Sequence, residues 1–406
     1  MTHAVIAGAG IGGLTAALAL AKAGFAVTLI ERAPGLTEVG AGLQISPNAS
    51  AILRDLGVLE ALREKAVAPS GIRIRRARSA ATLSFLSLET AEARWHAPYL
   101  VAHRADLQHV LADAVARDPA ITLHLGTALA GFGTTDSGVA ITAKQGLLTR
   151  GFEADLLIGA DGVRSVVRAK LLQGASDSPE ATGRTAWRAV VPAAALDRLP
   201  QAEQNGRFET GLWLGRDAHL VHYPLRGGDL VNLVAIIREP PLDPGFDTLW
   251  ATPGDPKIIT ARFAGWSQTA RDLIAAAPSW LRWPLADRAP LPSWNAGPVA
   301  LLGDAAHPVL PFLAQGAAQA IEDAQALATA LTAQGSIAER LAAYSRSRQA
   351  RVLAVQNASR RLGQIYHLAG PAAVARDIAM RALGSRRLLA RYDWLYGYSR
   401  ENEFGI

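Results

Sequence analysis

Hydrophobic positions at the start of the chain fall into a strand–helix–strand pattern. Residues 4–10 (AVIAGAG) form a short apolar run, which is typical of a strand buried on both faces. Residues 14–24 (LTAALALAKAG) have helical spacing and end at Gly24. Residues 25–31 (FAVTLIE) form a second apolar run that ends on Glu31. The chain therefore opens with a predicted βαβ unit.

The same reading places further elements along the chain. Helices are predicted from Pro47 to residue 66, from Arg104 onward and from about Gly316. Strands are predicted at 71–76, 82–88, 121–129, 152–162 and 299–307, and they dominate from Thr185 to about Phe263. The region from residue 337 onward is mostly helical in pattern.

This order of elements predicts an α/β fold with a Rossmann-like nucleotide-binding domain that is split by an inserted, mainly antiparallel β-sheet domain. The nucleotide domain is predicted to comprise residues 1–70, 100–177 and 295–336. The inserted sheet domain takes residues 71–99 and 178–294, and a C-terminal helical region takes residues 337–406.

Composition narrows the class of protein. The chain has 406 residues, of which 50% are hydrophobic and 19% charged, and this suits a globular protein with a large core. It contains no cysteine, which excludes disulfides, thiolate chemistry and cysteine-ligated metal centres, and no metal site is expected. A cytoplasmic location is expected.

Positive charge is concentrated near the C-terminus. The net charge is +6, and residues 346–391 hold ten arginines and one acid, Asp377. Glycines at 363, 370 and 384 divide this stretch into several predicted helices. A solvated face or a dimer contact is the preferred interpretation, with a monomer or homodimer expected. Attraction to an anionic membrane surface is the alternative, but no apolar aromatic face accompanies the charge. Nucleic acid is not an expected partner, because no basic run is interleaved with aromatics.

The glycines of the first unit point to a dinucleotide. Gly8, Gly10 and Gly13 form G-x-G-x-x-G between the first predicted strand and helix. Gly8 allows the tight turn, Gly10 lets a pyrophosphate approach the backbone, and Gly13 permits close helix–strand packing. Glu31 is placed to accept hydrogen bonds from a ribose diol. A chance Gly-rich turn is the alternative, and the unit alone does not distinguish FAD from NAD.

Two further acid–glycine pairs follow predicted buried strands. Asp161 precedes Gly162 and is followed by Arg164 and Arg168, whereas Asp304 follows Gly303. With the Gly-rich turn, these stretches make the chain resemble the single-component FAD-dependent aromatic hydroxylases (class A flavoprotein monooxygenases). The resemblance covers nearly the whole chain. It is strongest for the branch of salicylate hydroxylase, 3-hydroxybenzoate 6-hydroxylase and 6-hydroxynicotinate 3-monooxygenase, to which LVHYPLRGG and YDWLYGY contribute.

The resemblance implies FAD as cofactor and roles for several residues. Asp304 would hold the ribityl hydroxyls, and Arg104 would contact FAD near the ribityl chain and pyrophosphate. The helix from Gly316 would direct its positive end at the flavin pyrimidine. Asp161 and the arginines after it would serve both FAD and NAD(P)H. Further implied cofactor contacts are Gly12, Arg32, Leu129 and Ala317. A turn or cap role for Asp304 and a surface position for Arg104 are the alternatives.

The inserted sheet contains the candidate catalytic residues. Period two in HLVHYPL puts His219 and Tyr223 on one face of a strand and His222 on the other. The first two match a pair that relatives use at the substrate phenol, which implies that a base there removes the phenolic proton. His222 is a weaker candidate for the substrate pocket. His219 could instead be a satisfied core or surface histidine.

Residues around the predicted pocket leave the substrate open. Residues 309–312, which include Pro311 and Phe312, are apolar where some relatives have a polar residue, so an apolar roof is expected. Trp213 is a further candidate for the lining. Arg188 could bind a substrate carboxylate bidentately, but an arginine on the sheet surface is the favoured interpretation.

The predicted function is that of an FAD-dependent monooxygenase. It would use NAD(P)H and O2 to hydroxylate a small aromatic or N-heteroaromatic acid or phenol through a flavin C4a-hydroperoxide. The sequence does not choose between NADH and NADPH. One alternative is the same chemistry on a larger lipid-like or polyketide ring. The other is a non-oxygenating dehydrogenase or a nucleotide-binding regulatory protein, which would not retain flavin.

Overall fold

The computed structural model describes residues 1–36, 41–172, 177, 179–197, 208–240 and 251–398. Short parts of each of the three predicted regions therefore lie outside the described residues.

The first domain is built on a six-stranded sheet with the order β18-β19-β11-β1-β2-β7. Its pairs are parallel except β18–β19. The strands are β1 (His3–Ala7), β2 (Ala26–Ile30), β7 (Ile121–His124), β11 (Leu156–Gly159), β18 (Asn295–Ala296) and β19 (Val299–Leu301). Their apolar sequences follow from burial on both faces of the sheet.

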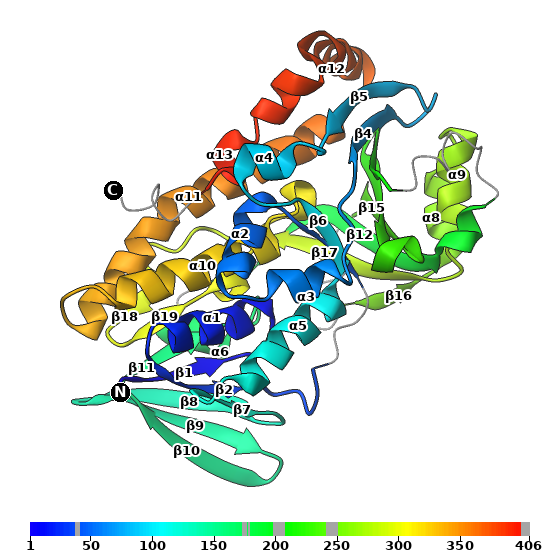
Figure 1. Cartoon of the computed structure of the whole chain (residues 1–406). Coiled ribbons are helices and arrows are strands. Elements are labelled where there is room, and N and C mark those ends of the chain that lie inside the picture. Colours follow the sequence, from blue (N-terminus) through cyan, green and yellow to red (C-terminus); the bar gives the residue numbers. More distant parts are fainter. Residues whose placement is uncertain (37–40, 173–176, 178, 198–207, 241–250, 399–406) are drawn as a thin grey trace.

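Helices cover one face of this sheet, and a smaller sheet covers the other (Figure 1). The helices are α1 (Ile11–Lys22), α5 (Arg104–Arg117) and α10 (Gly316–Leu331). The opposite face meets α6 (Val166–Leu171) and the antiparallel sheet of β8 (Ala128–Thr135), β9 (Gly138–Gln145) and β10 (Leu148–Ala154). Both layers contribute to one buried hydrophobic cluster.

The second domain is an eight-stranded sheet with the order β16-β17-β12-β15-β14-β13-β4-β5. Its pairs are antiparallel except β13–β4, so the predicted mainly antiparallel sheet is confirmed. The strands are β4 (Gly71–Arg76), β5 (Thr82–Ser87), β12 (Glu180–Pro192), β13 (Thr210–Gly215), β14 (Ala218–Leu225), β15 (Leu230–Arg238), β16 (Thr252–Gly254) and β17 (Trp280–Asp287). One face packs against α8 (Pro256–Arg262) and α9 (Gln268–Ala275), and the other faces the first domain.

The remaining elements join the two domains. They are β3 (Gly42–Ile45) paired with β6 (Leu100–His103), α2 (Pro47–Asp55), α3 (Leu59–Arg63), α4 (Ala91–Trp95), and the 3-10 turns η1 (Ala193–Leu196), η2 (Arg226–Gly228), η4 (Gly303–Ala305) and η5 (Pro311–Leu313).

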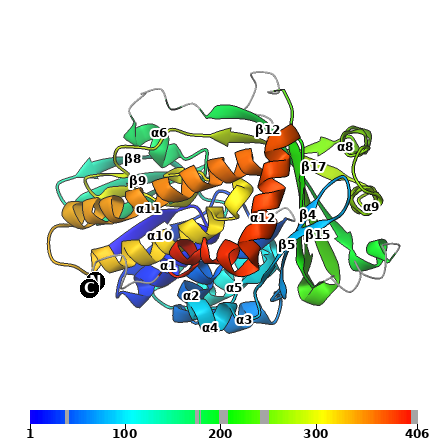
Figure 2. The same ribbon diagram turned by 90° about the horizontal axis from the view of Figure 1, so that it is seen from above.

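The C-terminal helices are α11 (Ile337–Tyr366), α12 (Gly370–Ala390) and α13 (Asp393–Tyr396). Figure 2 shows α11 running along α10 and α12 beside β4 and β5. The C-terminal helices therefore pack against both domains. Within the described residues, none of the helices has the length and apolar composition needed to span a bilayer.

Four predicted elements are wrong in detail. The helix predicted from Pro47 to residue 66 breaks at Gly57, where φ is +74°. The predicted strands at 121–129 and 152–162 each divide between two sheets, because the chain turns between β7 and β8 and between β10 and β11. Residues 256–262 form α8 and not a strand. Asp255 caps that helix by accepting from the Lys257 N–H at 2.9 Å.

Candidate functional site

Three loops singled out in the sequence meet at one edge of the six-stranded sheet. Strands β1, β11 and β19 are parallel neighbours, so their C-terminal ends lie side by side. Gly8, Asp161 and Asp304 lie directly after these strands. A Cβ atom added to Gly8 would lie 3.0 Å from the Cα of Asp161, and one added to Gly12 would lie 2.8 Å from Cδ2 of Leu302. Open α/β sheets bind ligands at such an edge.

The Gly-rich turn combines tight packing with open space. A Cβ atom on Gly13 would lie 1.8 Å from the carbonyl oxygen of Gly8, so only glycine fits there. A Cβ atom on Gly10 would meet nothing within 4 Å. Gly10 precedes α1, whose first turn has neither a side-chain cap nor an acidic residue. The N–H groups at the start of α1 are therefore available to a phosphate.

Glu31 connects the end of β2 to this turn. Its Oε2 accepts a hydrogen bond from the Ala9 N–H at 2.8 Å, and its Oε1 accepts from the Ala33 N–H at 2.9 Å. A ribose diol would share the carboxylate with these two groups. Arg32 beside it is exposed, and Leu129 is half-buried in β8 against the core of the first domain.

Asp161 has one engaged oxygen and one buried oxygen that the protein leaves unused. Its Oδ2 accepts from the N–H groups of Val166 and Val167, at 2.7 and 3.3 Å, at the start of α6. Its Oδ1 is buried and has no hydrogen-bond partner. Burial raises the pKa of this carboxyl group. Because a buried acceptor without a partner is costly, Oδ1 fits a ligand that donates a hydrogen bond.

Arg168 corrects one expectation about the residues after Asp161. Its guanidinium is buried, pairs with Asp177, and donates to the carbonyl oxygens of Ala305 and Ala306 at 3.1 and 2.7 Å. Its donors are thus occupied within the protein. Arg168 supports the loop that contains Asp304 and is not available to NAD(P)H.

Asp304 and Arg104 lie on the side of the edge that faces the second domain. Asp304 is in η4, and its side chain is accessible to solvent. The surrounding protein raises the pKa of its carboxyl group, and the positive charges of Arg104 and His307 act in the opposite direction. Arg104 begins α5, and its charge also acts on Arg188 in β12. Arg104 therefore lies between the two domains and not on an outer surface.

The N-terminus of α10 faces open space. Gly316 and Ala317 in its first turn are half-buried, and a Cβ atom on Gly316 would meet nothing within 4 Å. The turn has no side-chain cap and no acidic residue. Its free N–H groups are therefore suited to an electron-rich ring edge, as expected for a flavin pyrimidine.

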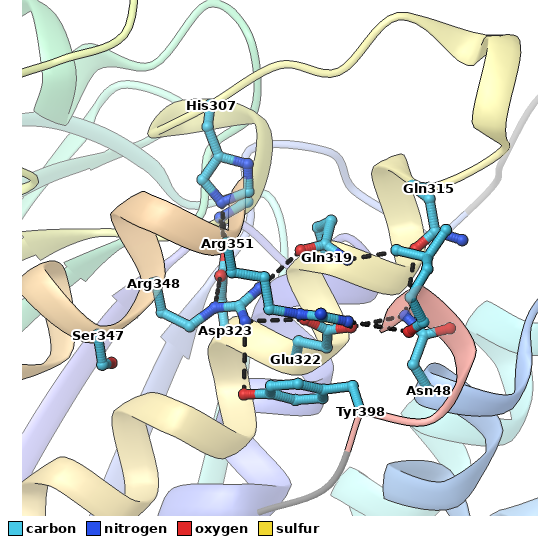
Figure 3. Close-up of polar contacts among 12 residues, drawn as sticks. Asn48, His307, Gln315, Gln319, Glu322, Asp323, Ser347, Arg348, Arg351 and Tyr398 are labelled. Carbon is cyan, nitrogen blue, oxygen red and sulfur yellow. Dashed lines mark hydrogen bonds and ion pairs between the residues drawn. The ribbon is translucent and has the colours of Figure 1, made fainter. Parts of the chain in front are cut away.

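A buried network of polar side chains supports this helix end (Figure 3). Asn48 donates to Gln315 and Glu322, at 3.1 and 2.6 Å, and thereby links α2 to α10. Arg348 from α11 donates to Gln319 at 2.8 Å. The network fixes the start of α10 between two other helices.

Four ionised residues form the centre of this network, and we call them the ion cluster: Glu322, Asp323, Arg348 and Arg351. Arg348 pairs with both Glu322 and Asp323 at 2.8 Å, and all three are fully buried. Asp323 also accepts from the Gly303 N–H at 2.9 Å and contacts His307 Nε2 at 2.6 Å. Burial opposes its ionisation, but His307 and Arg348 outweigh burial and lower its pKa to about 2. The cluster therefore holds the turn before Asp304.

The second domain presents polar residues to this edge. We call Arg184, Arg188, His219, Tyr223 and Asn232 the site face, because strand pairing places them on one side of the eight-stranded sheet. The Gly42 N–H of β3 donates to Oδ1 of Asn232 at 2.9 Å, and a Cβ atom on Gly42 would lie 2.5 Å from Cε2 of Tyr223. The two domains thus touch at Tyr223.

His219 is buried and bonded to a histidine from the C-terminal helices. Its Nδ1 lies 2.8 Å from Nε2 of His367, which follows α11. Burial lowers the pKa of His219 well below 6.5, and His367 and Arg184 lower it further. Burial also lowers the pKa of His367, to about 4. Both imidazoles are therefore neutral near pH 7.

The hydrogen bonds of this pair indicate the tautomers. Arg184 Nε donates to His367 Nδ1 over 3.4 Å, and a guanidinium can only donate. His367 then carries its proton on Nε2 and donates it to Nδ1 of His219. His219 consequently carries its own proton on Nε2. Burial raises the pKa of Tyr223, so the phenol remains protonated and is available as a donor.

Two residues predicted to line the pocket lie on the other side of the sheet. Trp213 is buried in the cluster beneath α8 and α9, and its ring centroid is 6.3 Å from that of His222. A Cβ atom added to Gly211 would lie 1.9 Å from Nε2 of His222. Because side chains alternate along a strand, neither residue can share a pocket with Tyr223. We leave both out of the proposed substrate pocket.

The apolar loop after His307 lies against the site face. The ring of Phe312 in η5 is 5.6 Å from that of His219, and Arg184 lies over it at 5.8 Å. Phe312 is buried, and Pro311 before it is half-buried. The two residues are therefore placed to form an apolar cover beside His219.

Comparison with known proteins decides the family. The model of the family described as an FAD binding domain matches residues 1–216 and 263–359. The chain is 35% identical over 405 residues to 3-hydroxybenzoate 6-hydroxylase from Klebsiella oxytoca, and covers 98% of each protein. It is 35% identical over 360 residues to 6-hydroxynicotinate 3-monooxygenase from Bordetella bronchiseptica, which spans 87% of this chain and 89% of that protein. A solved salicylate hydroxylase substrate complex has a TM-score of 0.83 at 28% identity, covering 99% and 97% of the two chains.

The chain belongs to the FAD-dependent aromatic hydroxylases. FAD, the cofactor of this family, fits the features described above. The first turn of α1 and the space at Gly10 suit the pyrophosphate, and the free oxygen of Asp161 and the accessible Asp304 suit hydroxyl groups. The start of α10 suits the flavin pyrimidine.

Several residues of this hydroxylase escaped prediction. His367 lies 148 positions from His219, and no local pattern joins them. Asn232 sits in an apolar strand, and only pairing with β14 sets it opposite Tyr223. The ion cluster had one detectable signal, the acidic pair Glu322–Asp323 within a predicted apolar helix. Acids rarely occupy buried helix positions unless they have partners.

Proposed function

We propose that this hydroxylase uses FAD, NAD(P)H and O2 to hydroxylate a small aromatic or N-heteroaromatic acid or phenol. One observation supports this above the others: the edge that fits FAD directly faces a sheet surface bearing His219 and Tyr223. The two relatives compared above are named for hydroxybenzoate and hydroxynicotinate, which fits a small polar ring.

Bound FAD would take a hydride from NAD(P)H and pass the electrons to O2 at its C4a carbon, which makes an electrophilic oxygen available. The chain's part is to position the ring and increase its electron density. His219 Nε2–H and the Tyr223 hydroxyl, both donors in the tautomers described above, would stabilise the phenolate form of the substrate. Phe312 and Pro311 would exclude water beside them.

The histidine pair offers an exit for the phenolic proton. In the opposite tautomers, His219 and His367 each hold their proton on Nδ1. The phenol then gives its proton to His219 Nε2, and His219 Nδ1 gives its proton to His367 Nε2. His367 Nδ1 releases a proton toward Asp217, which is partly exposed. Arg184 can then donate to the vacated Nδ1, so it favours the state after transfer.

The purified protein tests this proposal directly. We expect a yellow protein with bound FAD, whose NAD(P)H oxidation and O2 uptake rise when salicylate, 3-hydroxybenzoate or 6-hydroxynicotinate is added. A colourless protein would contradict it. So would NAD(P)H oxidation without O2 uptake, which would indicate a dehydrogenase. The Asp304→Ala variant should retain less FAD than the wild-type protein, and equal flavin content would remove the role given to Asp304.

A further inference from the structure

Arg188 is placed in the middle of the site face. Strand pairing aligns Val221 of β14, Val234 of β15 and Arg188 of β12 in one row across the sheet. The rows on either side begin at His219 and Tyr223. Adjacent strands are about 4.8 Å apart, so the Cα atoms of Arg188 and Val221 lie about 10 Å apart. An arginine side chain can extend over Val234 into the space between them.

Arg188 lacks the partners that other arginines of this sheet have. Arg73 pairs with Glu209, and Arg282 pairs with Glu239 at 3.4 Å. Arg184 donates to His367. Arg188 makes no hydrogen bond or ion pair in the part of the chain that the structure describes, and its Nε is buried without a partner. Its guanidinium lies over the ring of Trp283, at 5.1 Å.

The environment of Arg188 disfavours an unmatched positive charge. Burial lowers the pKa of its guanidinium, and the charge of Arg104 acts in the same direction. A guanidinium nevertheless stays protonated in proteins. A partly buried cation beside a second cation is therefore unfavourable until an anion joins it. Arg188 is thus not the arginine on the outer sheet surface that the sequence favoured.

The spacing on the site face matches a ring that carries both a hydroxyl and a carboxylate. A planar ring lying over Val221 and Val234 would reach His219 and Tyr223 with one end. Its other end would point along the row toward Arg188. A carboxylate there would accept two parallel N–H bonds from the planar guanidinium.

We infer that Arg188 binds the carboxylate of the substrate, so that the enzyme selects aromatic carboxylic acids over neutral phenols. This inference deepens the proposed function and rests on it. Arg188 acts by binding and orienting the ring, while His219 and Tyr223 act on the hydroxyl. Phe312 and Pro311 supply no charge, so the specificity for an anion comes from Arg188.

Ligand binding to the FAD-loaded enzyme tests this inference without turnover. Titrations that follow the flavin spectrum would compare each acid with its amide: salicylate with salicylamide, 3-hydroxybenzoate with 3-hydroxybenzamide, and 6-hydroxynicotinate with 6-hydroxynicotinamide. The wild-type enzyme should bind at least one acid about ten-fold or more tighter than its amide. Arg188→Gln should weaken binding of that acid about ten- to a hundred-fold and change amide binding less than about two-fold.

Two further variants complete the test. Arg188→Lys keeps the charge but loses the planar fork, so its acid binding should lie between wild type and Arg188→Gln. Arg216→Gln, whose side chain is 81% exposed at the end of β13, should bind acids and amides as the wild type does.

The result that overturns the inference differs from the one that overturns the proposed function. A wild-type enzyme with no preference for any acid over its amide would overturn the inference. Equal weakening of acid and amide in Arg188→Gln would also do so, as would loss of FAD with the acid preference intact. The proposed function fails separately, if no ring compound stimulates NAD(P)H-dependent O2 uptake.

Discussion

A buried histidine with a low pKa can act as a base only if the proton it accepts can leave again. His219 meets this condition through His367, which lies 2.8 Å away and is itself close to Asp217 and the outer arginines. The pair explains how one imidazole can serve the hydroxylation of a phenol while staying neutral at rest. At the residue scale, the chemistry thus depends on a contact between β14 and the end of α11.

We expect His219→Asn and Tyr223→Phe to slow product formation by about a hundred-fold or more in the histidine variant and by less in the tyrosine variant. Flavin reduction by NAD(P)H should change little, because neither residue is placed against the first strand ends. Product yield per NAD(P)H consumed measures the effect. His109→Gln, exposed on α5, is the matched control. Wild-type yields in both site variants would show that the phenol lies elsewhere.

The histidine pair also predicts a pH dependence of stability. The folded pKa of His367 is about 4, below the 6.5 of an unfolded histidine, so the unfolded chain binds more protons between these values. Its contribution is present above pH 6.5 and is lost as the pH falls toward 4. The His367→Gln variant should show a shallower fall in the free energy of unfolding across this window. An unchanged slope in urea titrations between pH 6.5 and 4 would contradict the assignment.

At the scale of elements, the Gly-rich turn separates two reasons for a glycine. Gly13 is required by the fold, because its Cβ position is filled by the Gly8 carbonyl. Gly10 is not required by the fold, because its Cβ position is open and its φ is −71°. The space at Gly10 is therefore explained by a ligand and not by packing.

This contrast gives a paired prediction. Gly10→Ala should leave the unfolding free energy of the FAD-free protein within about 0.5 kcal/mol of wild type, and weaken FAD binding by about 1–3 kcal/mol. Gly13→Ala should destabilise the FAD-free protein itself by about 3 kcal/mol or more. Thermal unfolding and FAD titration distinguish the two effects. If Gly10→Ala bound FAD as tightly as wild type, the pyrophosphate would have to lie elsewhere.

Helix packing also shows why some glycines failed as markers of helix ends. Gly363 lies inside α11, because its missing side chain admits the ring of Phe312: an added Cβ atom would lie 2.7 Å from that ring. Gly384 adopts a φ of +69° and interrupts the helical backbone of α12. The same residue type thus provides close packing at one position and a kink at the other.

At the scale of the whole molecule, the ion cluster connects α10 and α11 behind the cofactor edge. Arg348 is fully buried between Glu322 and Asp323, and burial opposes the ionisation of both acids. The arginines outweigh burial and lower both pKa values, Glu322 through Arg348 and Arg351. The cluster therefore contributes stability above the unfolded pKa near 4, which is lost as the pH falls toward 2.

Arg348→Met should leave two buried carboxylates short of a partner and cost about 3–5 kcal/mol of unfolding free energy at pH 7. Arg346→Met removes an exposed charge from the same helix and should cost less than about 0.5 kcal/mol. Urea unfolding of both variants measures the difference. A small effect of Arg348→Met would mean that the acids take up protons or find other partners.

The sequence determined the parts of this protein that depend on neighbours along the chain. Apolar runs, the spacing of Gly8, Gly10 and Gly13, and acids at strand ends predicted the βαβ unit, the split α/β fold and the FAD edge. These features follow from local backbone geometry and from burial of continuous strands. Alternation along β14 also separates His219 and Tyr223 from His222, because successive side chains of a strand point to opposite faces of its sheet.

The tertiary structure decided everything that depends on which elements meet. The sequence wrongly suggests Trp213 for the pocket, because a strand does not reveal which face it shares with its neighbours, and the sheet places this side chain beneath α8 and α9. The surface position favoured for Arg188 is wrong for the same reason. His367 joins the site only because α11 ends beside β14. Pairing register and helix packing act between residues far apart in sequence, and no local pattern contains them.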